Sequence, residues 1–200
     1  MVCHNCGVPD DLRERKKART RAAISAAALR LFAERGYEAV TIADVALAAD
    51  VGQRTVFRYF GDKDELLFGE DVAFRAALAD ALAARPRAEP AAVALREASA
   101  TIAGALDARR AELLTRMAVI DASPALVARE RAKHAGFEAV IKEGLAARGL
   151  GDPAARLLAR LGVACYAEAL NRWRDDPSVA LPDVMRACFA ELGAATADLS

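Results

Sequence analysis

The stretch QRTVFRYFGDKDE, from Gln53 to Glu65, places arginines, a lysine and a glutamine among three aromatic residues. In contacts with nucleic acid, arginine suits the acceptors of guanine, glutamine suits adenine, and the threonine methyl suits the methyl of thymine. Lysine and arginine also bind phosphate oxygens. These residues could therefore bind a polyanion, provided that the surrounding elements leave their polar side chains exposed.

The net charge of zero hides an uneven distribution along the chain. Residues 1–60 carry ten Lys and Arg against seven Asp and Glu, whereas residues 61–200 carry 18 against 21. A basic N-terminal segment predicts a polyanionic partner at that end of the chain, and the alternative is a solvated helix face. Six basic residues fall within nine positions, opposed only by Glu14: Arg13, Arg15, Lys16, Lys17, Arg19 and Arg21.

Apolar residues recur at helical spacing along nearly the whole chain, and strand-like alternation is nearly absent. This pattern predicts an all-α fold of about nine helices. The first helix is expected to end at Arg35, before Gly36. A short helix follows Thr41, which can form a capping box with Asp44, and a second short helix runs to Phe60. Further helices are expected at 62–84, 90–107, 110–120, 124–148, 153–174 and 182–197, four of them opened by a proline.

The two short helices are joined by a four-residue turn at 49–52 and preceded by a supporting helix, which predicts a helix-turn-helix. In that motif the second helix lies in the major groove, so its outward residues should read base edges. Gln53, Arg54 and Thr55 stand at those positions. The apolar residues of the same helix are expected in the core: Val56, Phe57 and Phe60.

The run LFAERGYEAVTIADVALAADVGQRTVFRYFGDKDELL resembles the N-terminal domain of the TetR family of transcriptional regulators. The resemblance covers about residues 15–68, and three signatures carry it in order: ERGYEAVT, ADVALAADV and TVFRYFGDKDEL. It implies an N-terminal helix-turn-helix domain that binds DNA. It also implies a divergent C-terminal domain that binds an effector and dimerises through its last two helices.

The resemblance further implies roles for individual residues. Thr41 stands where the family contacts a phosphate at a helix N-terminus, and Lys63 matches its phosphate-contacting lysine. Phe57 stands where tyrosine is common, while Asp50 and Gly52 stand where glycine and serine are usual. Aspartate tolerates the left-handed backbone better than most residues. The resulting DNA-binding set is Thr41, Gln53, Arg54, Thr55, Arg58, Tyr59 and Lys63.

The expected domains are a flexible tail at 1–14, a helix-turn-helix domain at 15–61, and an effector-binding and dimerisation domain at 62–200. By resemblance the last two helices form a homodimer interface, for which small residues such as Gly162 and Ala187 are suited, with packing inside the chain alone as the alternative. A small-molecule effector of unknown identity is expected between the middle helices, within a largely apolar wall. Its candidate lining, with ordinary core packing as the alternative, is Met117, His134, Phe137, Tyr166 and Trp173.

No metal site is expected. Cys3, His4 and Cys6 lack a fourth ligand. Glu130 and Glu138 flank His134 on one helix face, but a carboxylate-bridged metal bundle needs a second histidine on a facing helix.

No cofactor is expected, and no catalytic motif occurs, so an enzyme is not predicted. Cys165 and Cys188 are expected to be small buried apolar residues. The chain has no apolar run of about 18 residues and no export signal, which favours the cytoplasm and no membrane.

These features predict a TetR-like transcriptional regulator, with double-stranded DNA as its partner. It is expected to be a repressor that a small-molecule effector releases from a pseudo-palindromic operator. The alternative is a helical ligand- or protein-binding module that does not bind DNA. The residues do not fix the effector, the operator, the regulated genes or the direction of regulation.

Overall fold

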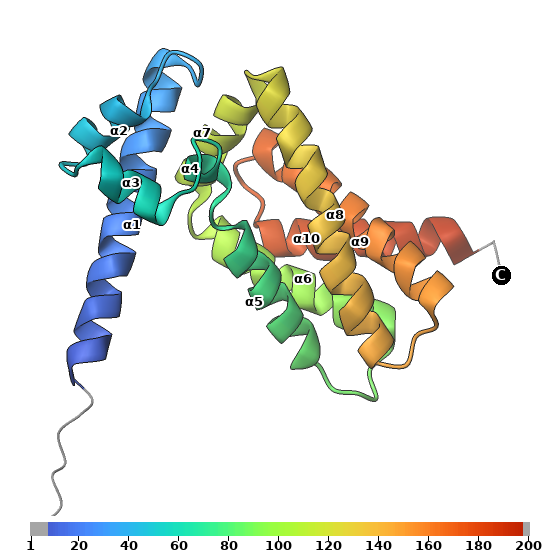
Figure 1. Cartoon of the computed structure of the whole chain (residues 1–200). Coiled ribbons are helices and arrows are strands. Elements are labelled where there is room, and N and C mark those ends of the chain that lie inside the picture. The colour runs from blue at the N-terminus through green and yellow to red at the C-terminus, as the bar shows by residue number, and fades with distance from the viewer. Residues whose placement is uncertain (1–7, 198–200) are drawn as a thin grey trace, which may run out of the picture. The chain divides into compact units, whose positions relative to one another are not determined.

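The computed structural model describes residues 8–197, and within this range it contains only helices and their connections (Figure 1). The all-α fold predicted from the helical spacing is therefore confirmed. Cys3, His4 and Cys6 lie outside the described residues. The helices are α1 (Val8–Arg35), α2 (Ile42–Ala48), α3 (Gln53–Tyr59), α4 (Glu65–Phe68), α5 (Asp71–Ala83), α6 (Ala91–Asp107), α7 (Arg110–Asp121), α8 (Pro124–Ala147), α9 (Asp152–Asp175) and α10 (Leu181–Thr196).

Two boundaries differ from the prediction. α1 begins at Val8, so residues 8–14 of the segment predicted as a tail are helical. The single helix predicted at 62–84 is divided into α4 and α5, which makes ten helices in the described range instead of about nine. The division falls at Gly69 and Glu70, where the Gly69 carbonyl oxygen accepts a hydrogen bond from Arg21.

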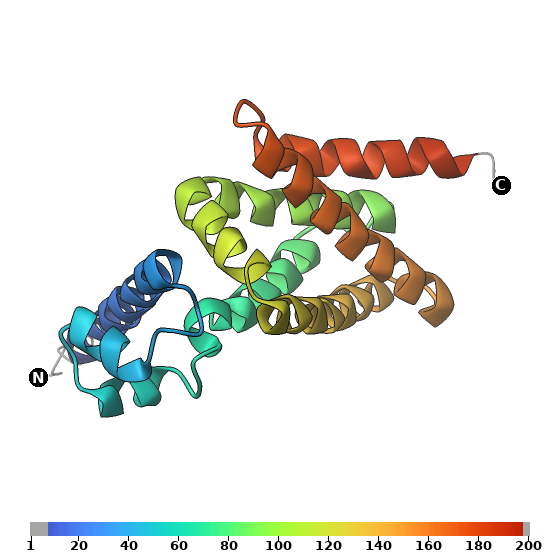
Figure 2. The same cartoon turned by 90° about the horizontal axis from the view of Figure 1, so that it is seen from above.

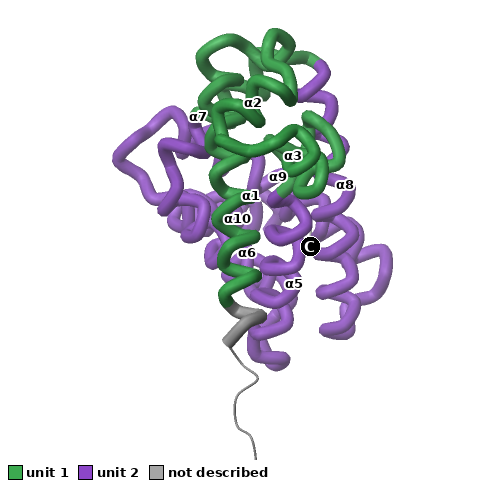
Figure 3. Tube along the Cα trace, turned by 60° about the vertical axis from the view of Figure 1, so that its left-hand side comes forward, with its two compact units in different colours: residues 1–69, 115–124 green, residues 70–114, 125–200 purple. Residues whose placement is uncertain are grey.

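The chain folds as two compact units, coloured separately in Figure 3. Unit 1 contains the chain up to Gly69 together with residues 115–124, and unit 2 contains residues 70–114 and the chain from Ala125 onward. The first unit thus ends at Gly69 instead of Gly61. The reason is that α4 packs on α1 and buries Leu66, Leu67 and Phe68.

Unit 1 is organised around the second half of α1, which contacts α2 and α4. Ile24, Ala28 and Phe32 on its inner face are almost completely buried. α1 ends as predicted, because Gly36 adopts a left-handed φ of 82° and its amide donates to the Phe32 carbonyl. Glycine takes this conformation without the steric cost of a Cβ.

Unit 2 is built around α6, which contacts α5, α9 and α10 (Figure 2). Ile141 and Leu145 of α8 are buried in the same apolar core. Cys165 of α9 and Cys188 of α10 belong to this core as unpaired thiols, and burial raises the pKa of both. Their predicted role as small buried apolar residues is confirmed.

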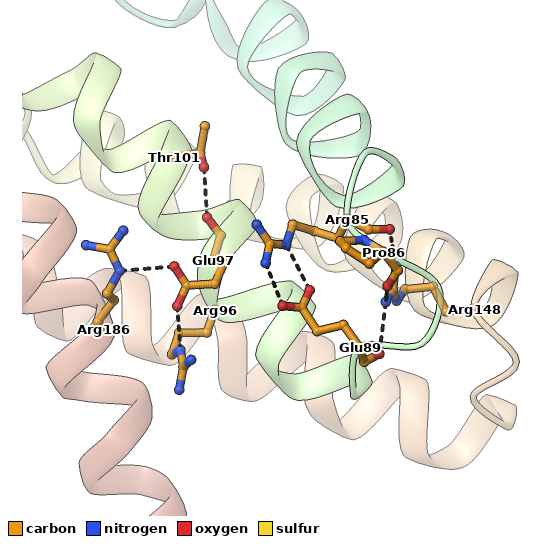
Figure 4. A network of polar contacts seen from close by, with 8 residues as sticks. All are labelled: Arg85, Pro86, Glu89, Arg96, Glu97, Thr101, Arg148 and Arg186. Atoms are coloured by element: carbon orange, nitrogen blue, oxygen red, sulfur yellow. Dashed lines mark hydrogen bonds and ion pairs between the residues drawn. The ribbon is translucent and has the colours of Figure 1, made fainter.

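Two polar networks hold the connections of unit 2 in place (Figure 4). At the α5–α6 connection, the Arg148 guanidinium donates to the carbonyls of Arg85, Pro86 and Glu89. Between α6 and α10, the Glu97 carboxylate accepts hydrogen bonds from Arg96 and Arg186 at 2.8 and 3.1 Å. Burial alone would raise the pKa of Glu97, but these hydrogen bonds outweigh it and hold the pKa below its usual value.

Trp173 is the largest fully buried side chain, and its polar atom is satisfied within the fold. Its indole Nε1 donates to Asp107 Oδ1 at 2.6 Å, and the same oxygen accepts from the Leu181 amide at 3.1 Å. The Arg110 guanidinium lies 4.2 Å from the indole centroid and donates to the carbonyls of Trp173, Asp176 and Val179. These contacts fix the connection between α9 and α10 against the end of α6.

Candidate DNA-binding surface

The first helix of the motif, α2, starts at a complete capping box. The Thr41 hydroxyl accepts a hydrogen bond from the Asp44 amide at 3.2 Å, and Asp44 Oδ2 accepts one from the Thr41 amide at 2.8 Å. The hydroxyl also donates to Asp44 Oδ2. Hydrogen bonds from the hydroxyl and the amide of Thr41 lower the pKa of Asp44. The predicted box is thus present, and a phosphate at Thr41 would have to draw its hydroxyl proton away from Asp44.

The turn between α2 and α3 closes on Asp50, which adopts a left-handed φ of 53°. The Val51 amide donates to the Ala46 carbonyl at 3.0 Å, and the Asp50 amide donates to the Leu47 carbonyl at 3.2 Å. This pair of bonds is a Schellman motif, which places a left-handed residue directly after the helix. Asp50 fills the position that glycine usually takes, as predicted, because its short polar side chain tolerates this backbone.

The second helix, α3, presents one exposed face and one buried face. Val56 is completely buried, and Phe60 just after the helix is 2% exposed, while Thr55 and Tyr59 are half-buried. Phe57 was predicted to be in the core, and this is wrong: it is 54% exposed. One helical turn separates it from Gln53, so both lie on the outer side. We call this outer side the reading face; it consists of Gln53, Arg54, Phe57 and Arg58.

Arg21 of α1 fixes the position of α3. Its guanidinium donates to the Tyr59 carbonyl at 2.8 Å and to the Gly69 carbonyl at 2.9 Å. It also lies 4.6 Å from the centroid of the Phe60 ring. The last carbonyls of a helix have no partner within the helix and carry partial negative charge, so one cation satisfies the ends of both α3 and α4. In the sequence Arg21 is one basic residue among six, and nothing there distinguishes its role.

Lys63 lies in the turn before α4, where its ammonium group is held within unit 1. It donates to the Tyr37 carbonyl at 2.6 Å and stands 4.1 Å from the centroid of the Tyr37 ring. The Tyr37 hydroxyl in turn donates to Asp64. Burial, followed by this bond and nearby carboxylates, raises the pKa of Tyr37. Lys63 has donors to spare for a phosphate, but it also anchors the loop that precedes α4.

The basic segment of α1 is exposed apart from Arg21. Lys17 makes an exposed ion pair with Glu14 at 3.0 Å, a kind of pair that is worth little in water. The cations of this segment lie at the surface. Those that the structure describes as exposed are Arg13, Arg15, Lys16, Lys17 and Arg19.

The candidate effector residues are not all brought together. Phe137 and Tyr166 pack against the core of unit 2, and His134 of α8 is half-buried. Trp173 is held in the core by Asp107, so its polar atom is already used within the fold. Met117 belongs to unit 1, because the second half of α7 is part of that unit. No cluster of three or more possible metal ligands occurs in the described part of the chain.

The outer side of α9 and α10 forms an open groove with a mostly apolar lining. Leu161, Ala164 and Cys165 contribute to it from α9, and Cys188 and Leu192 contribute from α10. Arg172 crosses its edge, with two hydrogen bonds of 2.8 Å to Glu191. We call this the α9–α10 groove.

No helix among the described residues is long and apolar enough to cross a membrane.

Comparison with known proteins identifies the class. Residues 24–69 match the bacterial regulatory proteins of the tetR family, and residues 89–197 match the MftR C-terminal domain. The chain is 31% identical over 188 residues to the "Putative mycofactocin biosynthesis transcriptional regulator MftR" of Mycobacterium tuberculosis, with 90% of this chain and 92% of that protein covered. The protein is a DNA-binding transcriptional regulator. It belongs to the TetR family.

Solved structures support the same fold. SmeT of Stenotrophomonas maltophilia, solved with triclosan, matches 88% of this chain and 91% of its own at a TM-score of 0.64 and 17% identity. FadR of Bacillus subtilis, solved with stearoyl-CoA, matches 84% and 95% at a TM-score of 0.57 and 17% identity. Both confirm the predicted arrangement of an N-terminal helix-turn-helix followed by a helical C-terminal domain.

The role of Arg21 can be separated from its charge by comparing Arg21→Ala with Arg19→Ala. Both variants remove one cation from α1, but only the first leaves the Tyr59 and Gly69 carbonyls without their donor. We expect Arg21→Ala to lower the free energy of unfolding by about 1–3 kcal/mol and Arg19→Ala to change it by less than about 0.5 kcal/mol. Urea denaturation measures both. Equal stability of the two variants would contradict the assignment.

Proposed function

We propose that the protein is a repressor that binds a pseudo-palindromic operator as a homodimer and leaves it when a small-molecule effector binds. The observation that carries this proposal is the reading face of α3. Two exposed side chains able to pair with bases, Gln53 and Arg54, stand on a helix held by the Schellman turn and by Arg21. Phosphate contacts come from Thr41, Lys63 and the exposed cations of α1, while Thr55, Arg58 and Tyr59 complete the DNA-binding set.

The regulated genes that we propose are those of mycofactocin biosynthesis. The support is the similarity to MftR, which extends over nearly the whole of both chains. Genomic DNA fragments that the purified protein retains should be sequenced and mapped. Their position relative to such genes decides this part of the proposal.

Base recognition and phosphate binding are expected to depend on two different residues, Arg54 and Lys63. Arg54→Ala removes a guanidinium that can reach guanine, so we expect a cost of about 1–3 kcal/mol on the operator and a relaxed preference at one base position. Lys63→Ala removes a phosphate contact, so the affinities for operator and for random DNA should fall by the same factor. The slope of log affinity against log salt should then flatten by about one for each subunit of the dimer. Titrations of both variants on both DNAs test this. If only the Lys63 variant lost the preference for operator over random DNA, the roles assigned to Arg54 and Lys63 would be wrong.

The homodimer is supported by the outer face of α9. Leu157 and Leu161, one helical turn apart, are 60% and 39% exposed, and Ala164 continues the same apolar strip into the α9–α10 groove. Exposed apolar strips of this kind are common in helical interfaces. A two-fold dimer that reads successive major grooves needs half-sites about 34–36 Å apart or a multiple of this distance.

Leu161→Glu tests the interface, with Val72→Glu as its control. Both changes place a carboxylate at an exposed apolar position of unit 2, so neither should unfold the chain. We expect the Leu161 variant to be monomeric by light scattering and to bind the operator at least about tenfold more weakly, since like charges would face each other in the dimer. The Val72 variant should remain dimeric. A dimeric Leu161 variant would exclude this face.

For the effector we propose a molecule with a large apolar part that contacts Phe137, Tyr166 and His134. Two aromatic rings on the core of unit 2 and a half-buried imidazole offer an apolar wall with a polar group, as small-molecule sites require. The other two residues of the set named from the sequence are left out of this proposal, because Trp173 is fully buried with its indole bonded to Asp107 and Met117 belongs to unit 1.

Binding of the effector should lower the affinity for the operator 5- to 150-fold, which corresponds to a coupling free energy of about 1–3 kcal/mol. Linkage requires the operator to weaken effector binding by the same factor. Isothermal titration of the effector into free and operator-bound protein measures both sides of the cycle. An effector bound equally well in both states would refute the release mechanism.

A further inference from the structure

Phe57 departs from the burial pattern of unit 1. The other phenylalanines of this unit are buried, with exposures of 1% for Phe32, 2% for Phe60 and 5% for Phe68, whereas Phe57 is 54% exposed. A large apolar side chain loses favourable free energy when it stays in water. An exposed phenylalanine on a short helix therefore calls for a contact that the isolated chain does not supply.

The position of Phe57 indicates what that contact is. It lies on the reading face, four residues after Gln53 and three after Arg54, so all three project from the same side of α3. Arg58 follows directly, with its guanidinium 5.3 Å from the Tyr59 ring. No aromatic or cation contact within the described chain involves the Phe57 ring. Two guanidinium groups beside an exposed ring favour a polyanion over an apolar protein surface as the occupant.

The chemistry of phenylalanine narrows the contact further. Phe57 has no hydroxyl and cannot donate to a phosphate or to a base acceptor. The apolar group that the major groove displays is the 5-methyl of thymine, which apolar side chains contact directly. We propose that Phe57 is a specificity-determining residue that recognises the 5-methyl group of a thymine in each half-site. The proposal rests on the reading of DNA by α3.

The helix geometry limits where that thymine lies. Residues 53 and 57 are separated by four residues, or about 6 Å along the helix axis. Base pairs are stacked about 3.4 Å apart. The thymine read by Phe57 should therefore fall within about two base pairs of the base read by Gln53 or Arg54. This places it inside the specific half-site and outside the flanking sequence.

The test uses the full-length protein and an operator selected by it from genomic fragments. Each thymine of the half-site is replaced in turn, symmetrically in both halves, by deoxyuridine, which differs only in lacking the 5-methyl. At one position the wild-type protein should lose about fourfold in affinity per half-site, or about 15-fold in total, the value of one buried methyl group. Phe57→Ala should bind the thymine operator more weakly than wild type and should bind the deoxyuridine operator at that position with no further loss. Phe57→Tyr keeps the ring and should keep the sensitivity.

Leu47→Ala is the matched control, since Leu47 is an exposed apolar residue, 84% exposed, on the neighbouring helix α2. It should retain the full loss on deoxyuridine. A Phe57→Ala variant that remains as sensitive to deoxyuridine as wild type overturns the proposal, as does one that binds the thymine operator with undiminished affinity. A protein that selects no DNA at all refutes the proposed function itself.

Discussion

The guanidinium of Arg21 lies where the C-terminal ends of α3 and α4 meet, and the recognition helix depends on this contact. α3 has seven residues, far fewer than the roughly 12–15 at which an isolated helix becomes even marginally stable in water. Its conformation must therefore come from its neighbours. Val56 and Phe60 supply the apolar contacts, and Arg21 supplies donors for the carbonyls that the helix cannot satisfy alone. The planar fork of arginine can donate to two carbonyls and stack on Phe60 at once, which the point charge of lysine cannot do.

The local signals of the motif could be read from the sequence because each depends on a few adjacent residues. The Thr41–Asp44 box, the left-handed Asp50 and the stop at Gly36 are all set by local backbone chemistry. Phe57 could not be placed in the same way. Its apolar character predicts the core, but the face on which it lies is determined by how α3 turns on α1. The break at Gly69 is hidden from the sequence for a similar reason, since the donor to its carbonyl is Arg21, 48 positions earlier.

In unit 2 the sequence predicts helices well and contacts poorly. Proline and glycine punctuation locates α6 to α10 to within one or two residues. The contacts that hold them are long-range and polar, such as Trp173 with Asp107 and Arg148 with the carbonyls around Pro86. Neither the spacing nor the residue types show which partners will meet. The candidate effector residues share this difficulty, because aromatic residues at helical spacing serve core packing and ligand contact equally well.

The residues of unit 1 are not continuous in the chain, and this has a consequence for biosynthesis. Residues 115–124 belong to that unit, and Arg116 donates to the Leu67 carbonyl at 2.9 Å. A ribosome releases these residues only after the whole of 70–114, so the DNA-binding unit is completed only after α5 and α6 of the other unit have been made. A stop codon or a protease cut after Gly69 would leave it without its last segment. An exchange of the DNA-binding unit between proteins that stopped at Gly69 would therefore lose the hydrogen bond from Arg116 to the Leu67 carbonyl.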